Sequence, residues 1–137
     1  MTDIKKEKMQ ISKLKCADLD AIIVYRTAQG NSLELIDHLE ALITPGVTTS
    51  VCGDFNICLL THRNKRVTRF LETNGFILLM NEVTHIKGGH IDHFYFKPGN
   101  NVFQNPSILR YSPYYSDHYT ICVTIERITK NEEAHEN

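Results

Sequence analysis

Several side chains capable of acid–base and metal chemistry stand next to segments with strand character. Asp54 and Asn56 follow Thr48–Cys52, a run rich in β-branched residues that predicts an at least half-buried strand ending at Gly53. Because strand side chains alternate between two faces, Asp54 and Asn56 would point the same way. The competing interpretation is an Asx-type turn, in which both side chains bond to nearby backbone, and this segment alone favours the turn.

Two later segments repeat this placement of polar groups beside strands. Asp92 begins an aromatic-rich run of strand character, and Asp117 and His118 directly precede Tyr119–Ile125, a second such run. Strand ends are where α/β folds place their chemistry. Three such ends in one short chain shift the interpretation of Asp54 from a simple turn to a functional site.

The three segments together resemble the motifs of the endonuclease/exonuclease/phosphatase superfamily. Gly53–Asn56 resembles its GDxN motif, Gly88–Asp92 its GxxID-like strand, and Ser116–His118 its SDH motif. The superfamily includes abasic-site endonucleases, pancreatic deoxyribonuclease and retroelement endonucleases, and the resemblance is to mobile-element domains in particular, retroelement or Helitron-type. It covers residues 19–127 and implies a metal-dependent phosphodiester hydrolase.

The resemblance also implies a role for each residue of the three motifs. Asp117 would be a ligand of Mg²⁺ or Mn²⁺, hard cations that favour carboxylate oxygens. His118 would contact the scissile phosphate, and Asp92 would orient its imidazole and keep it protonated near neutrality. Asp54 would align or deprotonate the attacking water, and Asn56 would hold that water and a phosphate oxygen.

Contacts to nucleic acid are predicted for one aromatic and several basic side chains. Tyr25 ends the apolar run Leu19–Tyr25 at the position where the family places a phenol near the phosphate, and Arg26 could meet phosphate through its planar fork. The alternative is a strand-end tyrosine with a solvated arginine. A dense basic cluster next to the site would contact the phosphate backbone, or else form a solvated helix face; it comprises Arg63, Lys65, Arg66 and Arg69.

The remaining elements predict an α/β (α+β) domain. Asn31 has the form of a helix cap, and leucines and isoleucines at helical spacing follow it until Pro45-Gly46. A second helix is expected over residues 65–74, ended by Gly75, and a short strand over residues 76–80. Residues 11–128 then form the domain, residues 1–10 a flexible basic N-terminus, and residues 129–137 a disordered tail.

One departure from the family pattern concerns the segment before Leu19. Family members carry an N-terminal half there, with an Asn, a metal-binding Glu and one of two facing sheets, and Glu7 does not suit that role. The chain therefore resembles the C-terminal half of the four-layer αββα sandwich. A lost carboxylate predicts weakened metal binding and impaired activity. An uncovered apolar sheet face predicts a homodimer, a partner that supplies the missing half, or poor solubility.

Composition excludes several other classes of protein. The chain has 137 residues, 42% of them hydrophobic, and a net charge of −1, so nucleic acid would be bound by a local patch and not by an overall basic field. Four cysteines form no CxxC pair, which predicts a reduced, intracellular protein, nuclear or cytoplasmic. No segment predicts a signal peptide or a membrane span.

Three functions follow from these observations. The leading hypothesis is a metal-dependent phosphodiester hydrolase, endonuclease-like, with DNA favoured over RNA. The alternative is a catalytically inactive nucleic-acid-binding or interaction remnant of a mobile element. The third is a zinc site formed by His85, His90 and His93, whose spacing is not a usual zinc pattern. The sequence does not identify the substrate.

Overall fold

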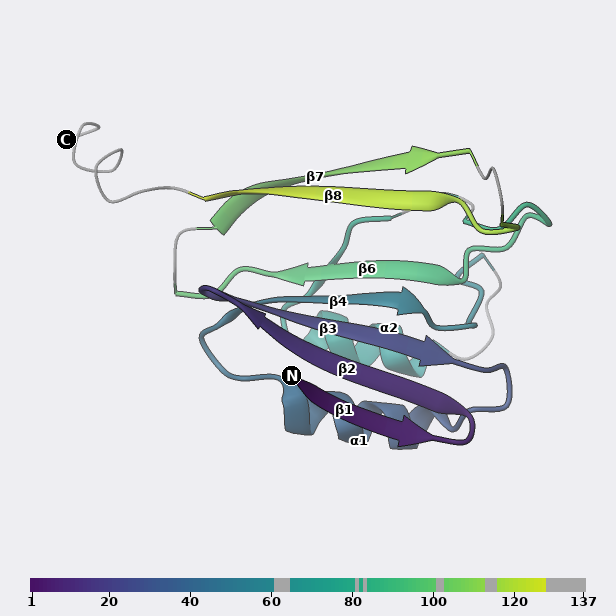
Figure 1. The fold of residues 1–137 in the computed structure, drawn as a ribbon, viewed down its shortest axis with the longest axis horizontal. Coiled ribbons are helices and arrows are strands. Elements are labelled where there is room, and N and C mark those ends of the chain that lie inside the picture. Colours follow the sequence, from purple (N-terminus) through teal and green to yellow (C-terminus); the bar gives the residue numbers. More distant parts are fainter. Residues whose placement is uncertain (61–64, 81, 83, 101–102, 113–115, 128–137) are drawn as a thin grey trace.

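A mixed six-stranded sheet, two helices and a separate β-hairpin make up the computed structural model (Figure 1). The structure describes residues 1–60, 65–80, 82, 84–100, 103–112 and 116–127. The strands are β1 (Thr2–Lys6), β2 (Met9–Cys16), β3 (Leu19–Arg26), β4 (Thr48–Asp54), β5 (Ile77–Leu78), β6 (Asp92–Lys97), β7 (Phe103–Tyr111) and β8 (Thr120–Arg127). The helices are α1 (Ser32–Leu42) and α2 (Arg66–Thr73).

The strands of the large sheet run in the order β1-β2-β3-β4-β6-β5. β3 and β4 are parallel and are joined through α1, as a crossover connection requires, and the other neighbours are antiparallel. Both helices pack against one face of the sheet, which Figure 1 shows with the helices behind the strands. Their leucines and valines meet the inward side chains of the strands in one core, which includes Ile22, Val24, Leu35, Leu39, Val51, Val67, Leu71 and Tyr95.

The face of the sheet opposite the helices, which we call the open face, is only partly covered. On β3, Ile22 and Val24 are buried under the helices, whereas Ile23 and Tyr25 are 47% and 54% exposed. Leu14 on β2 is exposed on the same face. The predicted uncovered apolar face is therefore present over β2 and β3.

The β7–β8 hairpin covers the other part of the open face. Ile121 of β8 lies against Cys52 of β4 and Phe94 of β6 across a shared pocket. The pairing of β7 with β8 shifts register between Gln104 and Ser107, next to Pro106, which has no N–H for the ladder. β7 is therefore irregular at Pro106.

The N-terminal segment differs from the prediction. Residues 1–10 were expected to be flexible, but β1 and the start of β2 form a hairpin in the sheet. Ile4 packs against the core, and Met9 and Ile11 are fully part of it. The charged side chains of β1 face solvent, so its polar composition reflects an edge strand and not disorder. β2 is paired on both sides, with β1 and with β3.

The helix ends follow the sequence. The Asn31 side chain accepts hydrogen bonds from the amides of Leu33 and Glu34, at 2.9 and 3.1 Å, as an N-cap does. Gly75, at φ +89°, takes the left-handed conformation expected after α2. Within the described part of the chain, no helix has the length and apolar character needed to cross a membrane. The predicted tail at residues 129–137 lies outside the described residues.

Candidate active site

Asp54, Asp92 and His118 converge where β4 ends and β6 begins; we call these three the acid–histidine cluster. His118 Nδ1 lies 2.7 Å from Asp92 Oδ2, and His118 Nε2 lies 3.8 Å from Asp54 Oδ2. All three side chains are partly buried, with 33% of the His118, 19% of the Asp54 and 15% of the Asp92 side chain exposed. One imidazole therefore bridges two carboxylates at the surface of the molecule.

Strand pairing brings the two carboxylates together. Asp54 is the last residue of β4 and Asp92 the first of β6, and they are direct partners in the antiparallel ladder. Thr84 fixes the start of β6, because its Oγ1 accepts hydrogen bonds from the amides of Ile91 and Asp92, at 3.1 and 3.0 Å. Cross-strand partners lie closest on one face of a sheet, so this register places both acids on the open face.

Main-chain bonds bring His118 to the same place from the far end of the chain. The Tyr119 amide donates to the Thr84 carbonyl at 2.7 Å, and His85 and His118 form an isolated antiparallel bridge. The His118 amide also donates to Ser116 Oγ at 3.1 Å. Thr84 thus anchors both Asp92 and the segment that carries His118. The sequence pattern had not identified Thr84 as part of the site.

The electrostatics of the cluster suit proton transfer. Burial and the neighbouring Asp92 carboxylate raise the pKa of Asp54, and the hydrogen bond from the Asn56 amide opposes that rise only in part. The hydrogen bond to Asp92 raises the pKa of His118 against the opposing effect of burial. Asp54 is therefore a stronger base than an ordinary aspartate, and His118 stays protonated to higher pH than an ordinary histidine.

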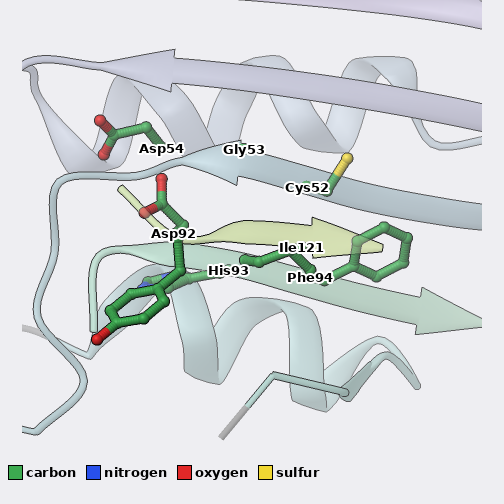
Figure 2. A pocket seen from close by; sticks show the side chains of 8 residues that line it. Cys52, Gly53, Asp54, Asp92, His93, Phe94 and Ile121 are labelled. Carbon is green, nitrogen blue, oxygen red and sulfur yellow. The ribbon is translucent and has the colours of Figure 1, made fainter. Parts of the chain in front are cut away.

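A pocket of about 250 Å³ adjoins the cluster on the open face. Figure 2 shows Asp54 and Asp92 at one end of it, with Cys52, Phe94 and Ile121 towards the other. Burial raises the pKa of the Cys52 thiol to about 11, so this thiol stays neutral and is no nucleophile. The pocket therefore offers an apolar wall beside a charged end.

Tyr25 and Asn56 lie at different positions relative to the acid–histidine cluster. Tyr25 is the partner of Asp54 in the parallel ladder and lies exposed on the open face, so the structure brings it to the site. Asn56 has φ +52°, and its amide donates to Asp54 Oδ1 at 3.0 Å. The strand-alternation argument that placed Asp54 and Asn56 on one face does not apply to Asn56, because the strand ends at Asp54. The Asx-type turn exists, and it holds one oxygen of Asp54 while the other faces His118.

Asp117, the predicted metal ligand, lies beside the cluster. Its Oδ2 is 3.3 Å from His85 Nε2, and its side chain is 57% exposed. A hydrogen bond from its own backbone amide lowers the pKa of Asp117, and His85 and His118 lower it further. The carboxylate is therefore charged and open to solvent, as a ligand for a divalent cation must be.

The structure corrects the predicted role of Arg26. Its side chain is buried beneath the helix face of the sheet and only 5% exposed, which excludes contact with phosphate. Its Nε and Nη2 donate to the Gly30 carbonyl at 3.0 and 2.6 Å, and its Nη1 donates to the carbonyls of Phe55 and Asn56 at 3.1 and 3.4 Å. Arg26 therefore fastens the loop that follows Asp54.

The basic cluster also lies away from the expected place. Arg66 and Arg69 are exposed, but α2 packs on the side of the sheet opposite the acid–histidine cluster. They do not adjoin the site, because the helix that carries them covers the other layer. Arg63 lies outside the described residues. Nucleic-acid contact by Arg66 and Arg69 stays a prediction.

The histidine trio considered for zinc is not brought together. His85 faces Asp117, whereas His90 and His93 are buried with ring centroids 5.4 Å apart. His93 follows Asp92 in β6 and faces the opposite side of the sheet, and His90, which precedes the strand, lies with His93. Burial lowers the pKa of His93 to about 4, and its ring stacks on Phe55 as part of the core.

The donor atoms around His118 suit a hard divalent cation. Among the described residues, two groups bring ligand atoms within 4.8 Å of one another: Asp54 with Asp92 and His118, and His85 with Asp117 and His118. The Asp92 carboxylate raises the pKa of Asp54, and a cation bound beside the two would relieve this repulsion. Oxygen donors of this kind fit Mg²⁺ or Mn²⁺.

Comparison with known proteins identifies the fold. No protein-family model matches the chain, and no curated protein matches it in sequence. The endonuclease domain of TRAS1, a telomere-specific non-LTR retrotransposon, has a similar structure, with a TM-score of 0.60 and 12% identity over 92% of this chain and 67% of that domain. An endonuclease/exonuclease/phosphatase family protein from Leptotrichia buccalis C-1013-b matches with a TM-score of 0.52 and 13% identity, over 86% of this chain and 53% of that protein.

These similarities establish the fold and its extent. The chain has the α/β fold of endonuclease/exonuclease/phosphatase proteins, and it spans about half the length of the bacterial protein and two thirds of the retrotransposon domain. The predicted fold class, a part of that larger sandwich, is confirmed. The fold is that of nuclease- and phosphatase-type proteins; the chemistry of this chain must be argued from its own residues.

Proposed function

We propose that the protein is a metal-dependent phosphodiester hydrolase of the endonuclease type, with DNA as its substrate. The observation that carries this proposal is the acid–histidine cluster, in which Asp92 holds His118 at 2.7 Å while Asp54 faces the other nitrogen of the same imidazole. The cluster borders an open pocket, so a phosphate group could reach it from solvent. The fold supports the proposal because the solved proteins that share it include an endonuclease domain.

Each residue has a separate task in this mechanism. His118, kept protonated by Asp92, donates Nε2–H to a non-bridging phosphate oxygen and stabilises the negative charge that grows there. Asp54, with its raised pKa, accepts a proton from the attacking water as that water bonds to phosphorus. The ester P–O bond opposite the water breaks in the same displacement, and the departing oxygen takes a proton from solvent. The Asn56 amide holds the second oxygen of Asp54 and fixes the direction of the carboxylate. Tyr25, beside Asp54 on the open face, would hold the phosphate with its phenol.

Asp117, and Asp54 or Asp92 beside it, would hold Mg²⁺ or Mn²⁺. When bound, such a cation supplies a Lewis acid that polarises the phosphate and lowers the pKa of a bound water. The protein's own contribution is to hold Asp54 and Asp92 partly buried against His118, where a cation is attracted more strongly than in water, and to keep Asp117 exposed beside His85.

A cleavage assay tests the proposal. Abasic duplex DNA, single-stranded DNA and a chromogenic phosphodiester are incubated with the protein in Mg²⁺, Mn²⁺ or a chelator. We expect metal-dependent cleavage that His118→Ala and Asp54→Asn lower by about 10²-fold or more. His38→Ala is the matched control, because His38 pairs with Glu34 on α1, in the other layer. Equal rates in the wild type and in His118→Ala would contradict the proposal.

A second candidate function is a catalytically inactive nucleic-acid-binding module. It is favoured by Arg66 and Arg69, which are exposed on α2, away from the acid–histidine cluster. This function predicts salt-sensitive DNA binding without turnover, weakened when Arg66 and Arg69 are both replaced by Gln. Binding that is unchanged in the double variant would count against it.

A further inference from the structure

His85 forms a side-chain pair with Asp117 next to the acid–histidine cluster. Its Nε2 lies 3.3 Å from Asp117 Oδ2, and its ring centroid is 5.0 Å from that of His118, with the planes at 81°. The His85 side chain is 15% exposed, whereas that of Asp117 is 57% exposed. A largely buried imidazole therefore supports an open carboxylate.

Hydrogen bonds determine which nitrogen of each imidazole carries the proton. The Lys87 amide donates to His85 Nδ1 at 3.1 Å, so Nδ1 is an acceptor and the proton of the neutral ring lies on Nε2, facing Asp117. In His118 the arrangement is reversed, because Nδ1 faces the Asp92 carboxylate at 2.7 Å and must carry the proton. When both rings are neutral, the two histidines are thus held in opposite tautomers. The protonated His118 of the proposed mechanism carries a second proton on Nε2.

The main chain around His85 is built to keep this arrangement. The Gly88 amide donates to the His85 carbonyl at 2.9 Å, and Gly88 has φ +93°, so a tight turn brings the Lys87 amide back towards the His85 ring. The amides of Thr84 and His85 both donate to the Gly89 carbonyl. Gly88 and Gly89 therefore shape the turn that sets the tautomer of His85.

A further bond ties this turn to the segment that carries Asp117. The Ile86 amide donates to the Asp117 carbonyl at 2.8 Å, one residue after His85. Main-chain bonds thus bring the two segments together, and the side-chain pair loses little additional freedom when it forms.

We propose that His85 is a positioning residue, which holds the Asp117 carboxylate through Nε2–H and presents it beside His118. The inference rests on the proposed function, in which Asp117 takes the divalent cation. The same role for His85 also distinguishes which of the two groups of possible metal ligands would bind the cation. While Nε2 of His85 carries the proton it has no lone pair for a metal, so the cation belongs to the carboxylates and not to a site of two histidines.

Nitrogen-15 NMR tests the tautomers directly and needs neither metal nor activity. Spectra that correlate the ring nitrogens with the ring protons are recorded at about pH 8, where an ordinary histidine is neutral. The His85 signals are assigned by their loss in His85→Gln. We expect Nε2–H for His85 and Nδ1–H for His118. A His85 ring with its proton on Nδ1 would overturn the proposal.

Manganese affinity then tests the positioning role. We expect His85→Ala to weaken Mn²⁺ binding about 10-fold, the loss typical when the partner of a metal ligand is removed, with His38→Ala as control. His85→Gln should retain most of the affinity, because its amide N–H₂ can still donate to Asp117. In the Asp117→Ala background, His85→Ala should add no further loss.

The outcomes separate this inference from the proposed function. Wild-type affinity in His85→Ala, equal damage by His85→Gln, or additive losses with Asp117→Ala would each overturn the positioning role. Absence of Mn²⁺ binding by the wild type would also overturn it. The expected pattern of affinities in a protein that cleaves no phosphodiester would support the role of His85 and refute the proposed function.

Discussion

Replacing Arg26 with methionine removes the guanidinium from beneath the loop of Asp54 and keeps an unbranched apolar stem. The change removes four hydrogen bonds that the guanidinium donates to three carbonyl oxygens, those of Gly30, Phe55 and Asn56. Because Arg26 is only 5% exposed, water does not readily replace the lost donors.

The size of the effect follows from these contacts. Hydrogen bonds from a charged donor contribute about 1.5–3 kcal/mol each, and those from Arg26 share carbonyls, so the gross loss is about 4–6 kcal/mol. This loss is partly offset because the variant no longer buries a charged guanidinium, a burial that is unfavourable and lowers the pKa of Arg26. We expect a net loss of about 2–4 kcal/mol, a large part of the 5–15 kcal/mol by which domains are stable.

Urea denaturation measures this loss. With an m-value of about 2 kcal/mol/M, the midpoint should fall by about 1–2 M. Arg66→Met, on the exposed surface of α2, is the matched control and should change stability by less than about 0.5 kcal/mol. A midpoint of Arg26→Met equal to that of the wild type would refute a structural role for Arg26.

Three other predictions follow from the site and the sheet. Asp92→Asn should lower the pKa of His118, seen by NMR titration. A histidine whose pKa is raised by folding stabilises the fold at pH values below its pKa in the unfolded chain, and this effect is lost as pH rises through the folded-state pKa. The stability deficit of Asp92→Asn should therefore grow towards about pH 5 and shrink towards about pH 9. A deficit that does not change with pH would contradict this. Gly88→Ala should lower the stability measured by thermal unfolding by about 1 kcal/mol. The cost comes from backbone strain at positive φ and not from a clash, because no atom lies within 4 Å of the added Cβ; an unchanged melting temperature would argue against the turn. Ile23→Thr on the open face should reduce aggregation in light scattering and cost less than about 1 kcal/mol, whereas Val24→Thr in the core should cost more; equal costs would refute the assignment of faces.

The sequence predicted the elements that carry the site because each has a strong local pattern. The strand ending at Asp54, the strand beginning at Asp92 and the strand following His118 all have β-branched or aromatic runs beside their polar groups. The Asn31 cap has an equally local signal, and the structure realises it. What these features share is that neighbouring residues alone determine them.

The errors involved interactions that depend on distant residues. Arg26 has the same strand parity as the buried Ile22 and Val24, a signal that could have shown its burial. Two of its three carbonyl partners, Phe55 and Asn56, lie 29 and 30 residues away and leave no local pattern. The hairpin of β1 with β2 depends on Ile4 packing against a core that forms from the rest of the chain. Likewise, nothing in the residues near His85 predicted that it would meet Asp117.

The register of the strands in the sheet could not be predicted from the sequence either. Asp54 and Asp92 are direct partners only because β6 enters the sheet beside β4, and a shift by one residue would place one of them under the helices. Asn56 was assigned to the face of Asp54 by alternation, but a positive φ ends the strand before it. The sequence could therefore predict which residues belong to the site, but not how they face one another.

Kinetics of DNA cleavage with a double variant test the central claim most directly. In Mg²⁺ or Mn²⁺, Asp92→Asn and His118→Ala should each lower kcat by about 10²-fold or more, and the double variant should be no slower than His118→Ala alone, because Asp92 acts through His118. Losses that multiply in the double variant, or a kcat of His118→Ala equal to that of the wild type, would contradict the account.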